Sequence, residues 1–144
     1  MAEIAGYVLR IASDRWVDHV FTMALYHTGL RRRWKQGQTV IFIHKTEVGD
    51  AVVGYGVIDR VCEQTELSEE EKLESEAWGK AIVFNYVIRF EKPLPVRETF
   101  MKEQKYRGRY AHGLQLSKEQ LDSVLNQAEL SSHQRTQSLK TFHS

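Results

Sequence analysis

The sequence predicts an α+β fold, in which a small mixed or antiparallel sheet curls toward a pseudo-β-barrel and carries peripheral helices. Two observations predict this class. The expected elements follow the order β-α-β-β-α-β, with an irregular segment and a last helix behind them. Gly54 and Gly56 lie inside an expected strand, where glycine usually marks a bulge, the tight bend of a barrel corner, or the close approach of another backbone or a ligand.

The first expected elements are a strand and a helix. Residues 6–12 (GYVLRIA) form an apolar run that ends at Ser13, a residue with the chemistry of a helix N-cap. From residue 14 to Leu25 apolar side chains recur every three or four positions, which predicts an amphipathic helix that ends before Gly29. Trp16 occupies an apolar position of this helix, so we expect it in the core.

The middle of the chain predicts two strands and a short helix. Residues 39–44 (TVIFIH) and 51–61 (AVVGYGVIDRV) are rich in β-branched and aromatic side chains and are separated by a turn at 47–50. The acidic segment that follows has a capping-box pattern at Ser68, which predicts a short helix ending near Gly79.

The last part of the chain predicts one long strand, an irregular segment and a helix. Residues 80–92 give the strongest strand pattern of the chain, and Pro93 and Pro95 are expected to end it. Residues 100–113 have no clear period and are expected as an exposed loop or an irregular edge. Residues 117–128 begin with a second capping box and predict a helix.

The length and composition favour a single globular domain. A chain of 144 residues has the size of one ordinary domain, and its 42% hydrophobic and 27% charged residues exclude the disordered and membrane classes. We assign residues 1–128 to this domain and residues 129–144 to a polar, flexible tail. No apolar run has the length of a membrane span, and Glu3 does not fit a secretory signal, so we expect a cytoplasmic protein without a membrane partner.

The charges are segregated along the chain, although the net charge is only +1. Residues 66–76 contain six Glu and one Lys, whereas residues 31–35 contain four cations and a tryptophan. A second basic segment, residues 102–110, contains lysines and arginines together with two tyrosines. This asymmetry predicts one face that attracts polyanions and another that repels them.

The two basic segments have the composition of a nucleic-acid interface. Lysine and arginine neutralise phosphates, and aromatic rings stack on unpaired bases. We therefore predict RNA or another nucleic acid as the partner. The candidate contacts in these segments are Arg31, Arg32, Arg33, Trp34, Lys35, Lys105, Tyr106, Arg107, Arg109 and Tyr110. For Trp34 two interpretations stay open, because a tryptophan between cations either anchors the loop in the core or offers its ring for stacking.

Two segments, 41–61 (IFIHKTEVGDAVVGYGVIDRV) and 81–96 (AIVFNYVIRFEKPLPV), resemble the PUA-like superfamily, which includes EVE, ASCH and YTH domains. Within that superfamily the chain looks most like an uncharacterised archaeal branch. The shared pattern is a strand, a Gly-Asp turn at 49–50, a GYG strand at 54–56, an acidic insertion and a long strand that ends before prolines. The resemblance covers roughly residues 6–128.

The resemblance implies a small pseudo-barrel that binds RNA or a modified base in a basic, aromatic-lined cleft. Carried over to this chain, the cleft would draw on four side chains, Trp34, Lys35, Lys45 and Tyr55. The chain lacks the G-x-K-x-x-x-x-R signature of ASCH domains and an aromatic cage at YTH-like spacing. The resemblance therefore implies neither ASCH-type catalysis nor recognition of a methylated base.

The sequence predicts no catalytic residue, no metal site and no cofactor. The six histidines show neither HxxxH spacing nor paired cysteines beside them, and the single Cys62 is expected as a buried, inert thiol. No nucleophile with a neighbouring base, and no pair of carboxylates at a fixed separation, is evident.

Three functions stay open, and we favour the first. The chain is a noncatalytic RNA-binding module; or a small enzyme that processes nucleic acid or a nucleotide, with Lys45, His27 or Arg109 assisting phosphoryl chemistry; or a protein-interaction domain. In the last case the acidic and basic faces of different copies would meet and give weak self-association.

Overall fold

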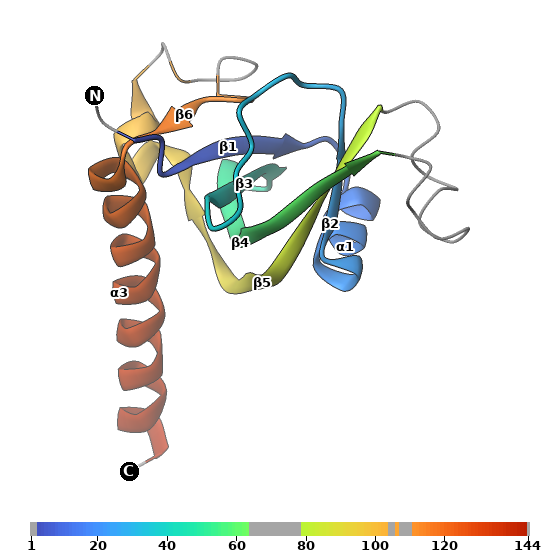
Figure 1. The fold of residues 1–144 in the computed structure, drawn as a ribbon. Coiled ribbons are helices and arrows are strands. Elements are labelled where there is room, and N and C mark those ends of the chain that lie inside the picture. Colours follow the sequence, from blue (N-terminus) through green and yellow to red (C-terminus); the bar gives the residue numbers. More distant parts are fainter. Residues whose placement is uncertain (1–2, 64–78, 104–105, 107–110, 144) are drawn as a thin grey trace.

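The computed structural model describes residues 3–63, 79–103, 106 and 111–143, with the backbone alone for 131–143 (Figure 1). The strands are β1 (Gly6–Ile11), β2 (Leu25–Thr28), β3 (Thr39–Thr46), β4 (Gly49–Glu63), β5 (Lys80–Pro95) and β6 (Gln115–Leu116). The helices are α1 (Asp14–Met23) and α3 (Lys118–His143), with short 3-10 turns η2 (Val96–Glu98) and η3 (Phe100–Lys102).

The six strands form one mixed sheet in the order β2-β5-β4-β3-β1-β6. β1 and β3 pair in parallel, from Gly6 opposite Thr39 to Ile11 opposite His44, and the other described strand pairs are antiparallel. The sheet curls strongly, with β2 and β6 as its two edges (Figure 1). The predicted α+β class with a mixed sheet and peripheral helices is confirmed, and the barrel-like sheet is not closed.

Irregular pairing between β4 and β5 bends the sheet. The register between these strands shifts at three places, and the first shift lies between Val52 and Gly54. A Cβ atom at Gly54 would overlap the carbonyl oxygen of Ile88 and crowd the ring of Phe21. Close backbone approach, expected for an interior glycine, is therefore confirmed at this position.

Each face of the sheet carries its own apolar cluster. Because neighbouring side chains of a strand point to opposite faces, Val8 belongs to one cluster and Leu9 to the other. The first cluster includes Leu121 and Val124 of α3, and the second includes Val17 and Val20 of α1. The two helices therefore cover opposite faces of the sheet.

The first helix ends earlier than its apolar pattern predicts. Ser13 caps α1 as expected, since its Oγ accepts a hydrogen bond from the backbone N–H of Trp16 at 3.4 Å. The helix stops at Met23 because Ala24 adopts the left-handed conformation with φ 53°, and Leu25–Thr28 then pairs with β5 as β2. The helix therefore ends before Gly29, as predicted, but Leu25, expected on its apolar face, belongs to a strand.

Two further boundaries differ from the predictions. β5 continues past Pro93 to Pro95, because Pro93 lies in an irregular stretch where the pairing with β4 jumps from Arg89 to Leu94, and Pro95 is the last residue of the strand. α3 continues to His143 through the segment predicted as a tail, because the residues after Lys118 include no glycine or proline that would end a helix. No helix in the described part of the chain is long and apolar enough to cross a membrane. The acidic helix expected near residues 68–78 lies outside the described residues.

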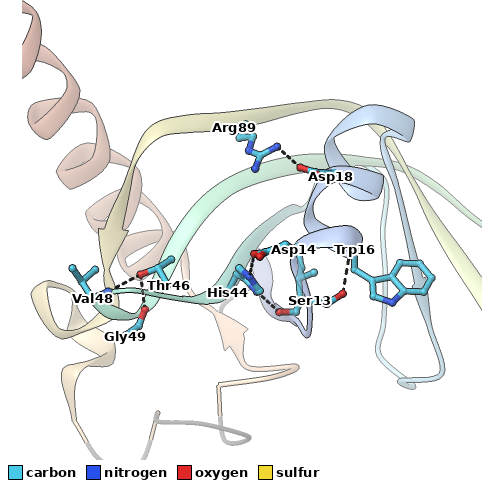
Figure 2. Close-up of polar contacts among 10 residues, drawn as sticks. Ser13, Asp14, Trp16, Asp18, His44, Thr46, Val48, Gly49 and Arg89 are labelled. Carbon is cyan, nitrogen blue, oxygen red and sulfur yellow. Dashed lines mark hydrogen bonds and ion pairs between the residues drawn. The ribbon is translucent and has the colours of Figure 1, made fainter.

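His44 ties the ends of β1 and β3 to the start of α1 (Figure 2). This nearly buried side chain places Nδ1 at 2.7 Å from the carbonyl oxygen of Ile11 and Nε2 at 2.8 Å from Oδ1 of Asp14. Asp14 is the first residue of α1, where a carboxylate also complements the helix dipole. One imidazole thus fixes the position at which the chain leaves the sheet.

We expect His44→Ala to lower the free energy of unfolding by about 1–3 kcal/mol, because it leaves the carbonyl group of Ile11 without its buried donor. Urea unfolding at neutral pH measures the loss. Asp14→Asn is the matched control: its side chain is 98% exposed, so we expect less than about 1 kcal/mol. Equal losses in the two variants would contradict the role assigned to the buried imidazole.

Candidate nucleic-acid interface

A cavity of about 500 Å³ lies where β1 and β3 end, between α1, β2 and the turn at 111–113. Its polar and aromatic lining consists of Arg10, Lys45, His27, His112, Tyr26 and Trp16. Ile11, Ala12 and Val20 complete the wall. Two cations, two imidazoles and two aromatic rings, with no carboxylate among the described lining residues, make this cavity suited to a ligand that is anionic and partly flat.

Two other hollows, of about 750 and 760 Å³, are larger but mix charges of both signs. Their acidic side chains are Glu47 and Glu98 in the first, and Glu3, Glu119 and Asp122 in the second. A carboxylate at the wall repels phosphate, so size alone does not make these hollows candidates for a nucleic acid. The cavity lined by Arg10 and Lys45 is therefore the better candidate.

Arg10 is held in place on three sides. Its guanidinium forms a bidentate ion pair with Asp50, at 2.7 and 3.1 Å, and its carbonyl oxygen accepts a hydrogen bond from the hydroxyl group of Tyr26 at 2.7 Å. Its backbone N–H donates to Nδ1 of His112 at 3.0 Å. Asp50 lies opposite Lys45 in the strand register, but its carboxylate forms its ion pair with Arg10. Within the described part of the chain, the Lys45 ammonium group has no ion-pair partner.

His112 and Tyr26 are both perturbed by their surroundings. Burial, and then the charges of Arg10 and Arg32, lower the pKa of His112. The neutral imidazole also fits the hydrogen bond, because Nδ1 accepts from Arg10. Burial raises the pKa of Tyr26, which therefore stays a hydrogen-bond donor at neutral pH. Perturbed groups in a cavity are a common mark of a functional site.

The first basic segment is a loop between β2 and β3, and some of its side chains pack against the protein while others are exposed. Arg32 is half-buried, and its Nε donates to the carbonyl oxygen of Gly113 at 3.0 Å. Trp34 is half-buried against Tyr7, with the rings edge to face and 4.7 Å between centroids, so the structure places it as an anchor of the loop. The remaining cations, Arg31, Arg33 and Lys35, are exposed.

Only part of the second basic segment can be placed. Tyr106 is half-buried, edge to face with Phe100 at 5.5 Å, whereas Lys105, Arg107, Arg109 and Tyr110 lie outside the described residues. The bond from Arg32 to Gly113 nevertheless puts the first basic segment beside the turn that directly follows the second.

The last candidate, Tyr55, does not line the cavity. Its ring packs 6.0 Å from that of Phe90, in the cluster beside α3. Burial raises its pKa, and the nearby Tyr86 and Glu129 add to the effect. Lys45 and Tyr55, which the resemblance placed in one cleft, therefore have different surroundings in the structure.

Sequence reasoning missed Arg10, His112 and Tyr26. Arg10 did leave a signal, because it is a lone cation in an apolar strand run, where a charged side chain needs a partner. His112 and Tyr26 left none: each meets Arg10 only through the tertiary fold, across 102 and 16 residues of chain.

Comparison with known proteins identifies the fold. No family model matches the sequence, and no curated protein sequence does. Among solved structures, a serine-to-alanine variant of the ASCH protein from Zymomonas mobilis matches with a TM-score of 0.62 at 11% identity, covering 88% of this chain and 98% of that one. The unsubstituted ASCH structure matches with a TM-score of 0.57 at 11% identity, covering 85% and 94%. A hypothetical protein from Leishmania major matches with a TM-score of 0.61 at 16% identity, covering 90% and 98%.

These likenesses show the fold alone. The chain has an ASCH-like fold, as the resemblance to the PUA-like superfamily implied. The agreement extends over nearly the whole of each of these matched structures and over most of this chain.

We expect Arg32→Gln to raise the pKa of His112, because it removes one of the two cations that disfavour protonation. Titration of the His112 ring by NMR measures the change. Arg33→Gln, which removes an equal charge from an exposed neighbour, is the control and should leave that titration unchanged. An identical His112 titration in Arg32→Gln and the wild type would contradict the assigned contact.

The same depressed pKa has a consequence for stability. The neutral imidazole contributes stability that is fully present above the unfolded value of about 6.5 and is lost as the pH falls through the folded-state pKa. We expect thermal unfolding of His112→Gln to depend less on pH than that of the wild type between neutral and mildly acidic pH. An unchanged pH dependence would contradict this contribution.

Proposed function

We propose that the chain is a noncatalytic nucleic-acid-binding module whose ligand is RNA. The observation that carries the proposal is the cavity at the ends of β1 and β3, whose described lining residues combine cations, imidazoles and aromatic rings and include no carboxylate. The exposed cations of the loop between β2 and β3 extend this charge over the surface. The ASCH-like fold supports it, since the superfamily resemblance implies a basic, aromatic-lined cleft.

In the proposed complex, phosphates lie along the loop and one base enters the cavity. Arg31, Arg33 and Lys35 would neutralise backbone phosphates, because their charged groups are exposed. Lys45 would hold the phosphate next to the inserted nucleotide. The half-buried indole of Trp16 offers an apolar wall for the base. Inserting one base requires an unstacked nucleotide, so single-stranded RNA is the expected form, with a modified base as one further ligand.

The second basic segment would extend the phosphate track. Its proposed contacts are Lys105, Tyr106, Arg107, Arg109 and Tyr110, which precede in the sequence the turn that Arg32 contacts at Gly113. Trp34 and Tyr55 would contribute by packing: Trp34 positions the loop, and Tyr55 stabilises the sheet beside α3.

Fluorescence anisotropy with short labelled single-stranded RNA, duplex RNA and DNA at several salt concentrations tests the proposal. We expect salt-dependent binding that is tightest for single-stranded RNA. Arg31→Ala with Arg33→Ala should lower the slope of log affinity against log salt by about 1.4–1.8, because two phosphate contacts are lost. Lys92→Ala with Lys118→Ala removes the same charge from hollows that also contain carboxylates and should leave the slope nearly unchanged. Equal slopes in both double variants would remove the loop from the interface.

A nuclease is the second candidate, because Lys45, His27 and His112 line the same cavity. Imidazoles can transfer protons and a lysine can stabilise a phosphorane-like charge without a metal ion. This function predicts that labelled RNA is cut in the presence of EDTA and that Lys45→Ala abolishes the cutting. RNA that stays intact over hours with wild-type protein would contradict the nuclease and leave the binding module in place.

A further inference from the structure

Two histidines meet beside the cavity although they are eight residues apart in the sequence. Nε2 of His19 on α1 lies 3.2 Å from Nε2 of His27 on β2, with the ring centroids 5.2 Å apart. The left-handed residue Ala24 causes this meeting, because it ends α1 and sends β2 back along the helix. Neither a helical nor a strand spacing predicts such a pair.

The pair is held in place by Trp16. Trp16 precedes His19 by three residues and therefore shares its side of the helix. Its indole lies edge to face with both imidazoles, at 5.3 Å and 79° to His19, and at 5.8 Å and 75° to His27. His27 is only 6% exposed, yet both it and Trp16 line the cavity. The contacts with Trp16 thus preorganise both imidazoles, and that of His27 is reached from the cavity.

We propose that His19 and His27 together chelate a divalent transition-metal ion such as Zn²⁺. Zinc binds imidazole nitrogen at about 2.0–2.1 Å in a tetrahedral arrangement, which places two ligand nitrogens about 3.3 Å apart. The observed 3.2 Å between the Nε2 atoms matches that edge of the coordination tetrahedron. Imidazole is also the ligand that zinc, nickel and copper share.

The site would be an open one. No group of three or more metal-ligating side chains occurs among the described residues, so that part of the chain supplies two ligands and leaves the other positions to solvent or to an anion in the cavity. Open positions are typical of sites at which the ion meets a ligand, whereas structural zinc sites are closed by four protein side chains. The inference does not depend on the proposed function, because it rests on the imidazole pair.

Titration with Zn²⁺ against a chromophoric competitor, and with Co²⁺ followed by its visible absorption, tests the site in the full chain. We expect one ion per chain for the wild type. His19→Gln and His27→Gln should each weaken the affinity at least about tenfold. His133→Gln, which removes a histidine of α3, is the control and should bind as the wild type does.

His19→Gln is the decisive variant, because His19 is only half-buried and we therefore expect the variant to fold. Far-UV circular dichroism checks that it does. In the wild type, Co²⁺ should also broaden the NMR signal of the Trp16 indole, which contacts both imidazoles. Absent wild-type binding, or equal affinity in wild type and a folded His19→Gln, would overturn the proposal and leave the pair as a hydrogen bond. RNA binding that persists without metal in His19→Gln separates the two proposals.

Discussion

The parallel pairing of β1 with β3 is the constraint on which the rest of the structure depends. It brings the carboxyl ends of two strands to the same edge of the sheet, from Gly6 opposite Thr39 to Ile11 opposite His44. In sheets with parallel strands, ligands commonly bind beyond such ends. Here α1 leaves from the end of β1, and the buried His44 fixes its departure. The cavity forms where these elements diverge.

The arginines of this region fall into two physical classes. Arg10 and Arg32 are partly buried, and their guanidinium groups donate hydrogen bonds within the protein. Arg10 donates to Asp50, and Arg32 donates to the carbonyl oxygen of Gly113. A guanidinium group suits this task, because its fixed fork of donors satisfies planar acceptors. Arg31 and Arg33 stay exposed on the same loop. A run of cations that looks uniform in sequence thus contains both structural and free charges, and only the free ones can give up counterions to a polyanion.

Regular sequence patterns made the sheet predictable. The site was harder to predict, because its residues meet only through tertiary contacts. β1, β3, β4 and most of β5 follow from β-branched, aromatic and glycine-containing runs, which report local preferences. β2 could not be predicted, because the apolar period of α1 continues through Leu25 and only its pairing with Val83 makes that residue part of a strand. The approach of Arg10 to His112 spans 102 residues of chain. A pattern within one segment contains no information on such a contact, whereas Ser13, whose capping is local, was predicted correctly.

The side chains around the cavity differ in how firmly contacts within the protein hold them before a ligand binds. Arg10 is fixed by Asp50 and Tyr26, His112 by the backbone of Arg10, and Trp16 by its imidazole neighbours. Groups that are already ordered lose little conformational entropy when a ligand binds, so their contacts contribute more fully to affinity. Lys45 is the exception among the described cavity residues, since its ammonium group is exposed and Asp50 is occupied. A rigid wall with one adjustable cation can hold a flat ring in a single orientation and still follow a phosphate whose position varies with the backbone of the bound strand.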